Sequence, residues 1–250
     1  MDDGLNLHVY HFLPKQKVNN RLILFHRGHW EKHVHGNRNI DFFLEREYSV
    51  LAFSMPLLGM NNRPTINTER DGKIRLKVHE DLKLLDSPIK PFVEPIAVSL
   101  NHVLKELYYD LIAMVGTSGR GWTTYLYSAI DQRIYKSYPV AGGYPLYLAS
   151  LQDFNPDYEA YSIELLQIAN CLELFILGSY GNGRSQLQIF NRFDPIISPG
   201  VLFQTYEDQI ASLISRLGKV KFEVFLDSTH REHKAPKHAL EIILKDMEEN

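Results

Sequence analysis

Residues 111–124 read LIAMVGTSGRGWTT, and this stretch decides how the rest of the sequence is interpreted. Its first five residues are apolar and predict a buried strand, the small residues from Gly116 to Gly121 predict a turn, and a helix is expected to follow. A serine between a strand and a helix can occupy a strained turn that presents its hydroxyl to a substrate. Ser118 holds that position, with glycines on both sides. We therefore predict that Ser118 is a nucleophile.

The same glycines allow two other interpretations. Gly116 and Gly121 have the spacing of a phosphate-binding loop, but Trp122 stands where that loop requires a lysine. A tight turn without chemistry is the second alternative, because strand-glycine-helix junctions are common. The usual G-x-S-x-G pattern has a small residue two positions after the serine, whereas this chain has Arg120 there and its next glycine at 121. Other segments must therefore support the assignment.

Short apolar runs alternate with helical stretches along the chain, which predicts an α/β fold: a mostly parallel twisted sheet with helices on both faces. We expect strands at 7–12, 21–25, 49–53, 111–115, 137–141, 172–177 and 222–226. We expect helices at 37–46, 92–107, 121–129, 158–168, 206–216 and 236–247. The span 54–91 is polar in its middle and holds Asp71-Gly72 between alternating apolar residues, which predicts a small hairpin beside the site. No repeat marks a second domain, so residues 1–250 are expected to form one domain.

The composition excludes several classes of protein. With 250 residues, of which 44% are hydrophobic and 23% charged, the chain can bury a sizeable core. Its net charge of -3 is too balanced to supply the electrostatic affinity that nucleic acid requires. The single cysteine, Cys171, cannot form an intramolecular bridge, and no apolar run is long enough for a membrane span or a secretory signal. We therefore expect a cytoplasmic protein without a nucleic-acid partner or a membrane segment, and no pattern indicates its oligomeric state.

The predicted strand at 21–25 leads into His26-Arg27-Gly28-His29. In acyl-transfer enzymes, a loop after an early strand supplies one backbone N–H to the oxyanion hole, and the residue after the nucleophile supplies the other. The candidate donors are therefore Gly119 and, in the early loop, Gly28 or His29. His26 is a candidate for substrate binding, although for at least one of His26 and His29 we favour a structural role, in which the ring binds a backbone carbonyl.

Histidines gather in two places, which raises the question of a metal site. One group comprises residues 26, 29, 33 and 35, and the other comprises residues 230 and 233. Their spacings match none of the specific zinc patterns, and no cysteine accompanies them. We therefore predict no metal.

A base for the serine is expected near the end of the chain, where residues 222–236 predict a strand followed by a loop with two histidines. We assign His233, which lies closer to the final helix, with His230 as the alternative. The acid that orients this histidine should lie between the serine and the histidine in chain order. Asp194 is our first choice, and the alternatives are Asp153 and Asp157.

Further motifs accompany the serine turn: His26-Arg27-Gly28-His29, Met55-Pro56-Leu57-Leu58-Gly59, Asp131-Gln132-Arg133-Ile134 and Pro139-Val140-Ala141-Gly142. With 116–124 and the late histidine loop, they make the chain resemble the α/β-hydrolase superfamily, in particular bacterial relatives of acetyl xylan esterases and dienelactone hydrolases. The resemblance spans the chain from about His8 to the last helix. It implies Ser118 as nucleophile, His233 or His230 as base and Asp194 as acid. No segment matches the first strand of the larger family, so we expect a trimmed version of a longer protein.

These assignments predict a serine hydrolase that cleaves a carboxylic ester, such as an acyl group on a carbohydrate or another small polar molecule, without a cofactor. The alternatives are a peptidase or thioesterase with the same residues, or a noncatalytic binding protein of the same fold. We expect the excursion at 54–91 to line or cover the pocket. Arg120 departs from the family's glycine and is expected either to bind anionic substrates or to pair with a surface carboxylate.

Overall fold

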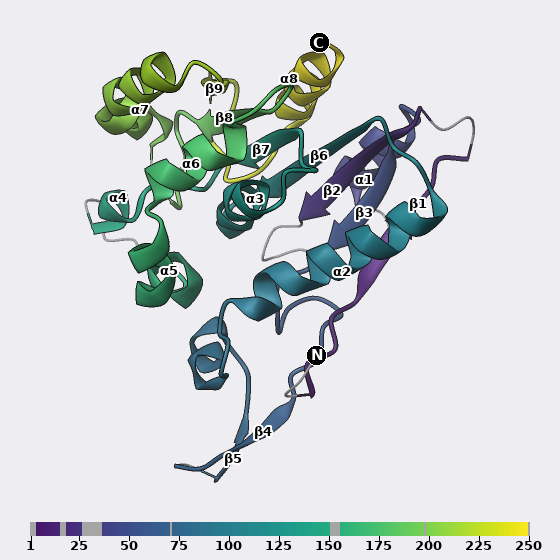
Figure 1. Cartoon of the computed structure of the whole chain (residues 1–250), viewed down its shortest axis with the longest axis vertical. Coiled ribbons are helices and arrows are strands. Elements are labelled where there is room, and N and C mark those ends of the chain that lie inside the picture. Colours follow the sequence, from purple (N-terminus) through teal and green to yellow (C-terminus); the bar gives the residue numbers. More distant parts are fainter. Residues whose placement is uncertain are drawn as a thin grey trace.

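The computed structural model describes residues 4–15, 19–26, 37–70, 72–150, 156–197 and 199–249. Its main sheet comprises seven strands: β1 (Val9–Phe12), β2 (Arg21–His26), β3 (Ser49–Phe53), β6 (Leu111–Thr117), β7 (Lys136–Val140), β8 (Ser185–Asn191) and β9 (Phe222–Asp227). Their order is β1-β3-β2-β6-β7-β8-β9 (Figure 1). Strand β1 pairs antiparallel with β3, and the other neighbours in the sheet are parallel. The predicted mostly parallel sheet is confirmed.

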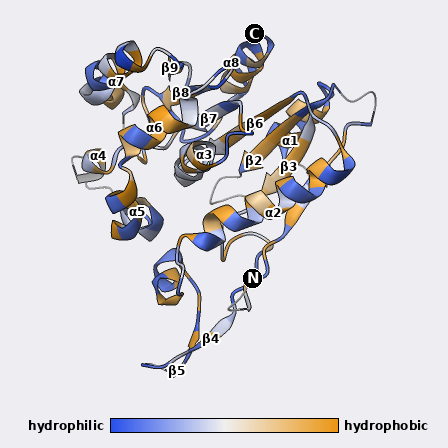
Figure 2. Ribbon diagram, in the orientation of Figure 1, coloured by the Kyte–Doolittle hydropathy of each residue, from blue (hydrophilic) through white to orange (hydrophobic). Residues whose placement is uncertain are grey.

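Helices cover both faces of this sheet, as the sequence predicts. Helices α1 (Arg38–Leu44) and α8 (Lys237–Glu248) pack on one face, and α2 (Lys90–Glu106) and α3 (Gly119–Ile130) pack on the other. The alternation along β2 explains this arrangement, because Ile23 and Phe25 join the first core whereas Leu22 and Leu24 join the second. Figure 2 shows the apolar residues concentrated in these central strands.

A third core lies around α3, α6 (Cys171–Ser179) and α7 (Gln204–Leu217). The remaining helices are short: α4 (Leu146–Ser150), α5 (Ile163–Ile168) and the 3₁₀ helices η2 (His79–Leu84), η3 (Tyr158–Tyr161) and η4 (Gly200–Phe203). In the part of the chain that is described, no single helix is long and apolar enough to cross a membrane, although 158–168 and 171–179 pass that test together as a pair bent by 76°.

The prediction of a strand at 172–177 is wrong, because Cys171–Ser179 form helix α6. Asn170 and Glu173 start this helix with a capping box, in which each side chain accepts a hydrogen bond from the other residue's backbone N–H. The strand that occupies the next place in the sheet is β8, whose buried face includes glutamine. Gln188, for example, accepts a hydrogen bond from the Tyr206 hydroxyl at 2.8 Å. Because these buried side chains are polar, a search for apolar runs does not detect the strand.

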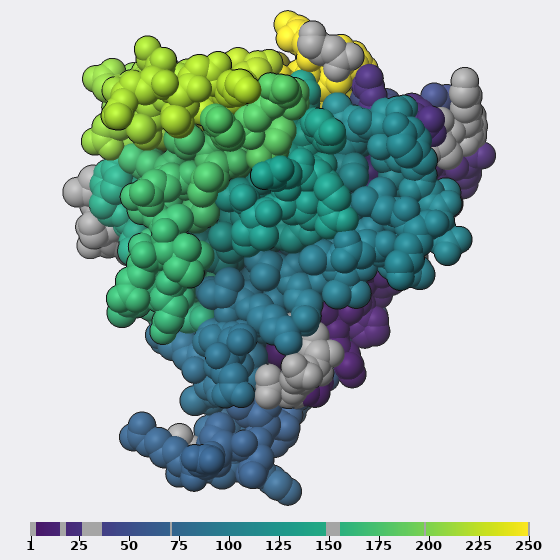
Figure 3. Space-filling view, in the orientation of Figure 1, coloured from purple at the N-terminus to yellow at the C-terminus, as the bar shows by residue number. Residues whose placement is uncertain are grey.

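The excursion predicted at 54–91 contains a two-stranded hairpin. Strands β4 (Thr65–Thr68) and β5 (Gly72–Arg75) pair antiparallel, with Ile66 opposite Ile74. Figure 3 shows this hairpin projecting from the body of the molecule. The base of the excursion is anchored, since Leu76, Leu82 and Leu85 are buried in the same core as Trp122 of α3.

Candidate functional site

Ser118 lies between β6 and α3 in a strained backbone conformation. Its φ of 65° and ψ of -136° fall in a region that residues other than glycine rarely adopt. The Ser118 N–H donates to the Val140 carbonyl at 2.9 Å, and the Ser118 carbonyl accepts from the Gly121 N–H at 2.8 Å. The neighbouring strand and the first turn of the helix therefore hold this conformation from both sides.

Glycines permit the backbone around Ser118 to pack this closely. A Cβ atom on Gly116 would lie 2.2 Å from Thr124 Oγ1, and one on Gly142 would lie 2.0 Å from the Ser118 carbonyl oxygen. A Cβ atom on Gly121 would lie 2.8 Å from the Gly142 carbonyl carbon. Gly121 is therefore the small residue that the close contact with Gly142 requires. This explains why the turn forms although Arg120 occupies the position where the G-x-S-x-G motif has a small residue.

Ser118, His233 and Asp194 form a continuous hydrogen-bonded chain. Ser118 Oγ lies 2.7 Å from His233 Nε2, and His233 Nδ1 lies 2.7 Å from Asp194 Oδ2. A carboxylate can only accept, so Nδ1 carries the ring proton and the neutral ring leaves Nε2 to accept from the serine hydroxyl. The histidine side chain is 7% exposed and the aspartate side chain 2% exposed. These three residues therefore have the geometry that proton transfer from Ser118 requires.

The loops that follow β8 and β9 bring the acid and the histidine together. Asp194 follows β8, where its Oδ1 accepts from the N–H groups of Ile196 at 2.9 Å and Ile197 at 3.1 Å. His233 follows β9, which lies parallel to β8. The adjacent carboxyl ends of these two strands therefore bring the side chains into contact although 39 positions separate them.

The other candidates for base and acid lie elsewhere or outside the described ranges. His230 Nε2 binds Asn191 Oδ1 at 3.1 Å, and His230 Nδ1 accepts from the Glu232 N–H at 3.1 Å. Asp157 Oδ2 lies 3.9 Å from His79 Nδ1, in a different cluster. Asp153 falls outside the described residues. The hydrogen-bonded chain of side chains that reaches Ser118 therefore contains His233 and Asp194, rather than His230 or Asp157.

Of the candidate oxyanion donors, Gly119 is the first residue of α3 and directly follows Ser118. The N–H groups in the first turn of a helix have no partner within the helix. Gly28 and His29 lie outside the described residues. His26 ends β2, is 2% exposed and stacks on Phe53 with ring centroids 6.0 Å apart, so its ring packs at the end of the sheet.

Arg120 is buried, which the sequence did not predict. The residue is only 1% exposed, so the expectation that it points to solvent and pairs with a surface carboxylate is wrong. Its charge acts on His79, another buried residue, in the excursion. Arg120 lies in the first turn of α3, and its side chain is in the protein interior.

His79 and Glu159 form a buried ion pair that sequence analysis missed. His79 Nδ1 lies 3.0 Å from Glu159 Oε1, and His79 Nε2 donates to the Pro56 carbonyl at 3.1 Å. Burial by itself would lower the pKa of His79, but the hydrogen bond and charge of Glu159 outweigh it and raise the pKa above the ordinary value. Asp157 adds to this rise and Arg120 opposes it. No local pattern marks such a pair, because the two partners come from distant parts of the chain.

The same cluster is the one place within the described ranges where three possible metal ligands converge: His79, Asp157 and Glu159. Both ring nitrogens of His79 already take part in hydrogen bonds, one to Glu159 and one to the Pro56 carbonyl. The positive charge of Arg120 also acts on this cluster. These contacts fit an ion pair better than a metal site.

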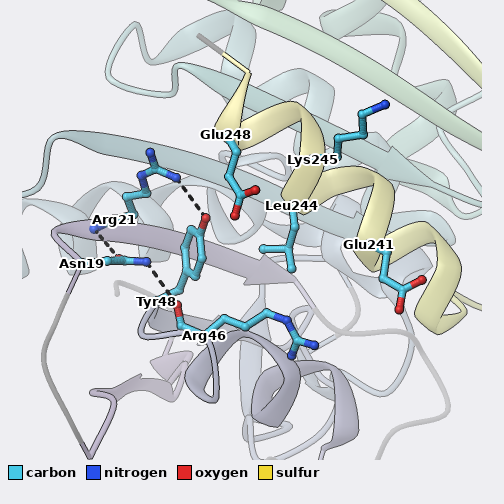
Figure 4. A pocket seen from close by; sticks show the side chains of 8 residues that line it. All are labelled: Asn19, Arg21, Arg46, Tyr48, Glu241, Leu244, Lys245 and Glu248. Atoms are coloured by element: carbon cyan, nitrogen blue, oxygen red, sulfur yellow. Dashed lines mark hydrogen bonds between the residues drawn. The ribbon is translucent and has the colours of Figure 1, made fainter.

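A separate pocket of about 500 Å³ lies at the opposite end of the parallel strands from Ser118 (Figure 4). Asn19 accepts from the Arg21 N–H and donates to the Arg46 carbonyl, and Arg21 donates to the Tyr48 hydroxyl at 3.1 Å. The other lining residues come from α8 and include Glu241, Leu244, Lys245 and Glu248. Hydrogen bonds thus join the start of β2 to the residues before β3 at this pocket, remote from the serine.

Comparison with known proteins supports the fold. A family described as PhoPQ-activated pathogenicity-related protein matches residues 98–171, and no curated protein matches the chain. TT1662 from Thermus thermophilus superposes with a TM-score of 0.65 at 16% identity, covering 97% of this chain and 93% of that one. An acetyl xylan esterase from Paenibacillus sp. R4 gives 0.63 at 16% identity, covering 98% and 80%. Est1E from Butyrivibrio proteoclasticus, solved with ferulic acid bound, gives 0.62 at 16% identity, covering 99% and 94%. With its sheet order, its serine turn and these structural neighbours, the chain has the α/β-hydrolase fold that the sequence resemblance predicts.

Proposed function

We propose that this protein is a serine hydrolase that cleaves a carboxylic ester. The observation that carries the proposal is the hydrogen-bonded chain from Ser118 Oγ through His233 to Asp194. Its serine occupies a strained turn, and burial protects the histidine and the aspartate from water. A binding protein that had lost its activity would have no need for this arrangement, so an enzyme is the better interpretation.

In the proposed reaction, Ser118 Oγ attacks the ester carbonyl carbon while its proton passes to His233 Nε2. Asp194 stabilises the imidazolium that forms and holds its Nδ1–H in place. Collapse of the tetrahedral intermediate breaks the bond to the alcohol, which takes the proton from His233 and leaves an acyl-serine. Water then attacks the acyl carbon with His233 Nε2 as base. Collapse of the second tetrahedral intermediate breaks the bond to Ser118 Oγ, which takes the proton back from His233, and the carboxylic acid leaves.

The negative oxygen of the tetrahedral intermediate needs hydrogen-bond donors. We assign one of them to the backbone N–H of Gly119, which follows the nucleophile at the start of α3. The second is assigned to the residues that follow β2 in the sequence, at Gly28 or His29. A donor of this kind contributes about 3–4 kcal/mol to the stability of the transition state.

For the substrate we propose an acyl group on a carbohydrate or another small polar molecule. The resemblance to acetyl xylan esterases supports this class, as do structural neighbours that include an acetyl xylan esterase and Est1E with ferulic acid bound. Arg120 is proposed to favour polar or anionic substrates through its charge beneath the first turn of α3.

Covalent labelling tests the nucleophile directly. A fluorophosphonate probe should label the wild-type protein, and peptide mass spectrometry should locate the label on Ser118. Ser118→Ala should lose both labelling and hydrolysis of p-nitrophenyl acetate. Ser128→Ala is the matched control, since Ser128 is a buried serine of α3, the helix that follows Ser118, and its hydroxyl donates to the Thr124 carbonyl. Undiminished turnover by purified Ser118→Ala would overturn the proposal.

A further inference from the structure

The Asn191 side chain joins the loop that carries His233 to the end of strand β8. Asn191 is the last residue of β8 and is fully buried. Its Nδ2 donates to the Glu232 carbonyl at 2.9 Å and to the Lys234 carbonyl at 3.2 Å. Glu232 and Lys234 flank His233, so one amide group binds the backbone on both sides of the proposed base.

Asn191 also contacts the loop of the proposed acid. Its backbone carbonyl accepts from the Asp194 N–H at 3.2 Å. The side chain of Asn191 thus holds the histidine loop, and its main chain holds the aspartate loop. The relative position of His233 and Asp194 therefore depends on this residue.

His230 contacts the oxygen of the Asn191 amide. The Glu232 N–H donates to His230 Nδ1 at 3.1 Å, which leaves the ring proton on Nε2 in the neutral histidine. His230 Nε2 lies 3.1 Å from Asn191 Oδ1 and can donate to it. The Asp227 carboxylate, whose Oδ2 lies 3.6 Å from Nε2, favours a proton at this position. With its oxygen occupied by His230, the amide presents its Nδ2 to the two carbonyls.

We propose that Asn191, oriented by His230, is the positioning residue that aligns His233 between Ser118 and Asp194. The inference rests on the proposed function and assigns a role to the second histidine of this loop, which does not itself reach the serine. Small displacements of a catalytic group can reduce a rate greatly. A flipped or absent amide at position 191 should therefore impair the proton transfer step rather than substrate binding.

The first experiment compares kcat with KM for p-nitrophenyl acetate. Asn191→Ala should lower kcat by about 10- to 100-fold and change KM by no more than about twofold, because it removes the bonds to both carbonyls. Asn19→Ala is the matched control: Asn19 also holds a loop through backbone hydrogen bonds, but at the opposite end of the strands (Figure 4). It should keep kcat within about twofold of wild type. An Asn191→Ala kcat equal to that of the control would overturn the proposal.

A pair of nearly isosteric substitutions at position 230 tests the orientation of the amide. His230→Gln retains a donor for Asn191 Oδ1, whereas His230→Glu offers that oxygen only acceptors when ionised. The glutamate should turn the Asn191 amide and bring its oxygen against the two carbonyls. We expect kcat to fall by about tenfold or more in His230→Glu and by no more than about threefold in His230→Gln. Equal losses in the two variants would overturn the assigned role of His230, and this pair decides the matter if Asn191→Ala does not fold.

A third measurement does not depend on turnover. With ¹⁵N-labelled histidine, NMR should show the His233 proton on Nδ1 in wild type and in His230→Gln, and a mixture of tautomers or a lost Nδ1–H signal in Asn191→Ala and His230→Glu. Unchanged His233 signals in the latter two variants would overturn the positioning role. If the wild type neither labels nor turns over, the proposed function fails, and the NMR result still decides whether Asn191 positions His233.

Discussion

His79 Nδ1 lies 3.0 Å from Glu159 Oε1, although the two residues are 80 positions apart in the chain. The contact joins η2, in the excursion after β3, to η3, in the segment after α4. Both residues are buried, at 5% and 2% exposed. Removing one partner of such a pair leaves an uncompensated charge in the interior, so the contact couples the stability of the two segments.

The first prediction concerns the pH dependence of this pair. The pKa of His79 is raised in the folded state, so protonated His79 stabilises the fold below the unfolded pKa of about 6.5, and this contribution is lost as the pH rises through the folded pKa. His79→Gln should therefore reduce the free energy of unfolding most at pH values below about 6.5 and progressively less above it. Denaturant titrations from acidic to alkaline pH measure this difference. Exposed His102 provides the control His102→Gln, and a difference that is independent of pH would contradict the prediction.

The second prediction concerns the proposed acid. Asp194→Asn should lower kcat by about 10⁴-fold, because an amide no longer favours the Nδ1–H tautomer of His233. Asp157→Asn, at the alternative acid, should leave kcat within about threefold of wild type. If Asp157→Asn lowered kcat more than Asp194→Asn, the acid would be Asp157, in the cluster with His79.

The third prediction concerns Gly142. Gly142→Ala should destabilise the protein by about 2–3 kcal/mol through overpacking, because the new Cβ would lie 2.0 Å from the Ser118 carbonyl oxygen. Gly218→Ala is the comparison: Gly218 has a φ of 67° with no atom within 4 Å of an added Cβ, so only conformational strain of about 1 kcal/mol applies. Thermal unfolding of both variants measures the contrast. Equal shifts would show that the serine turn tolerates the contact.

The fourth prediction concerns the hairpin of β4 and β5. Removing its projecting tip should change KM or the preferred acyl length more than the melting temperature, because the buried base of the excursion remains in place. Kinetics on esters of increasing acyl length, paired with thermal unfolding, distinguish the two effects. An unchanged profile across the panel would mean that the hairpin does not select the substrate.

The fifth prediction concerns Arg120. Because its charge opposes protonation of His79, Arg120→Met should raise the pKa of His79 further, which an NMR titration of that ring measures. In the same variant, kcat/KM for anionic esters should fall relative to that for neutral esters. If kcat/KM changed equally for both ester classes, the role of Arg120 would be structural only.

Much of the fold could be predicted because its central strands are apolar on both faces, as in β3, where all five residues are buried. Strand β8 could not be predicted from apolar runs, because buried glutamines interrupt its apolar pattern. Helix α6 is predicted as a strand instead, because a short apolar run does not distinguish a strand from a buried helix. His233 and Asp194 could be proposed from their places in loops after late strands and from the order serine, acid, histidine, although His230, Asp153 and Asp157 remained as alternatives. Asn191 and His79 could not, because their roles come from contacts with backbone carbonyls and side chains that only the folded chain brings near.

The close approach of Gly121 to Gly142 also bears on how such chains are found in sequence databases. A search that demands glycine two positions after the serine passes over this protein, because the steric requirement falls one residue later. A pattern of the form G-x-S-x-x-G, joined to a third glycine just after the next strand, describes this turn and leaves position 120 open to any side chain that the interior can accommodate. Substitutions at position 120 can therefore change the charge near the nucleophile without changing the glycines on which the turn depends.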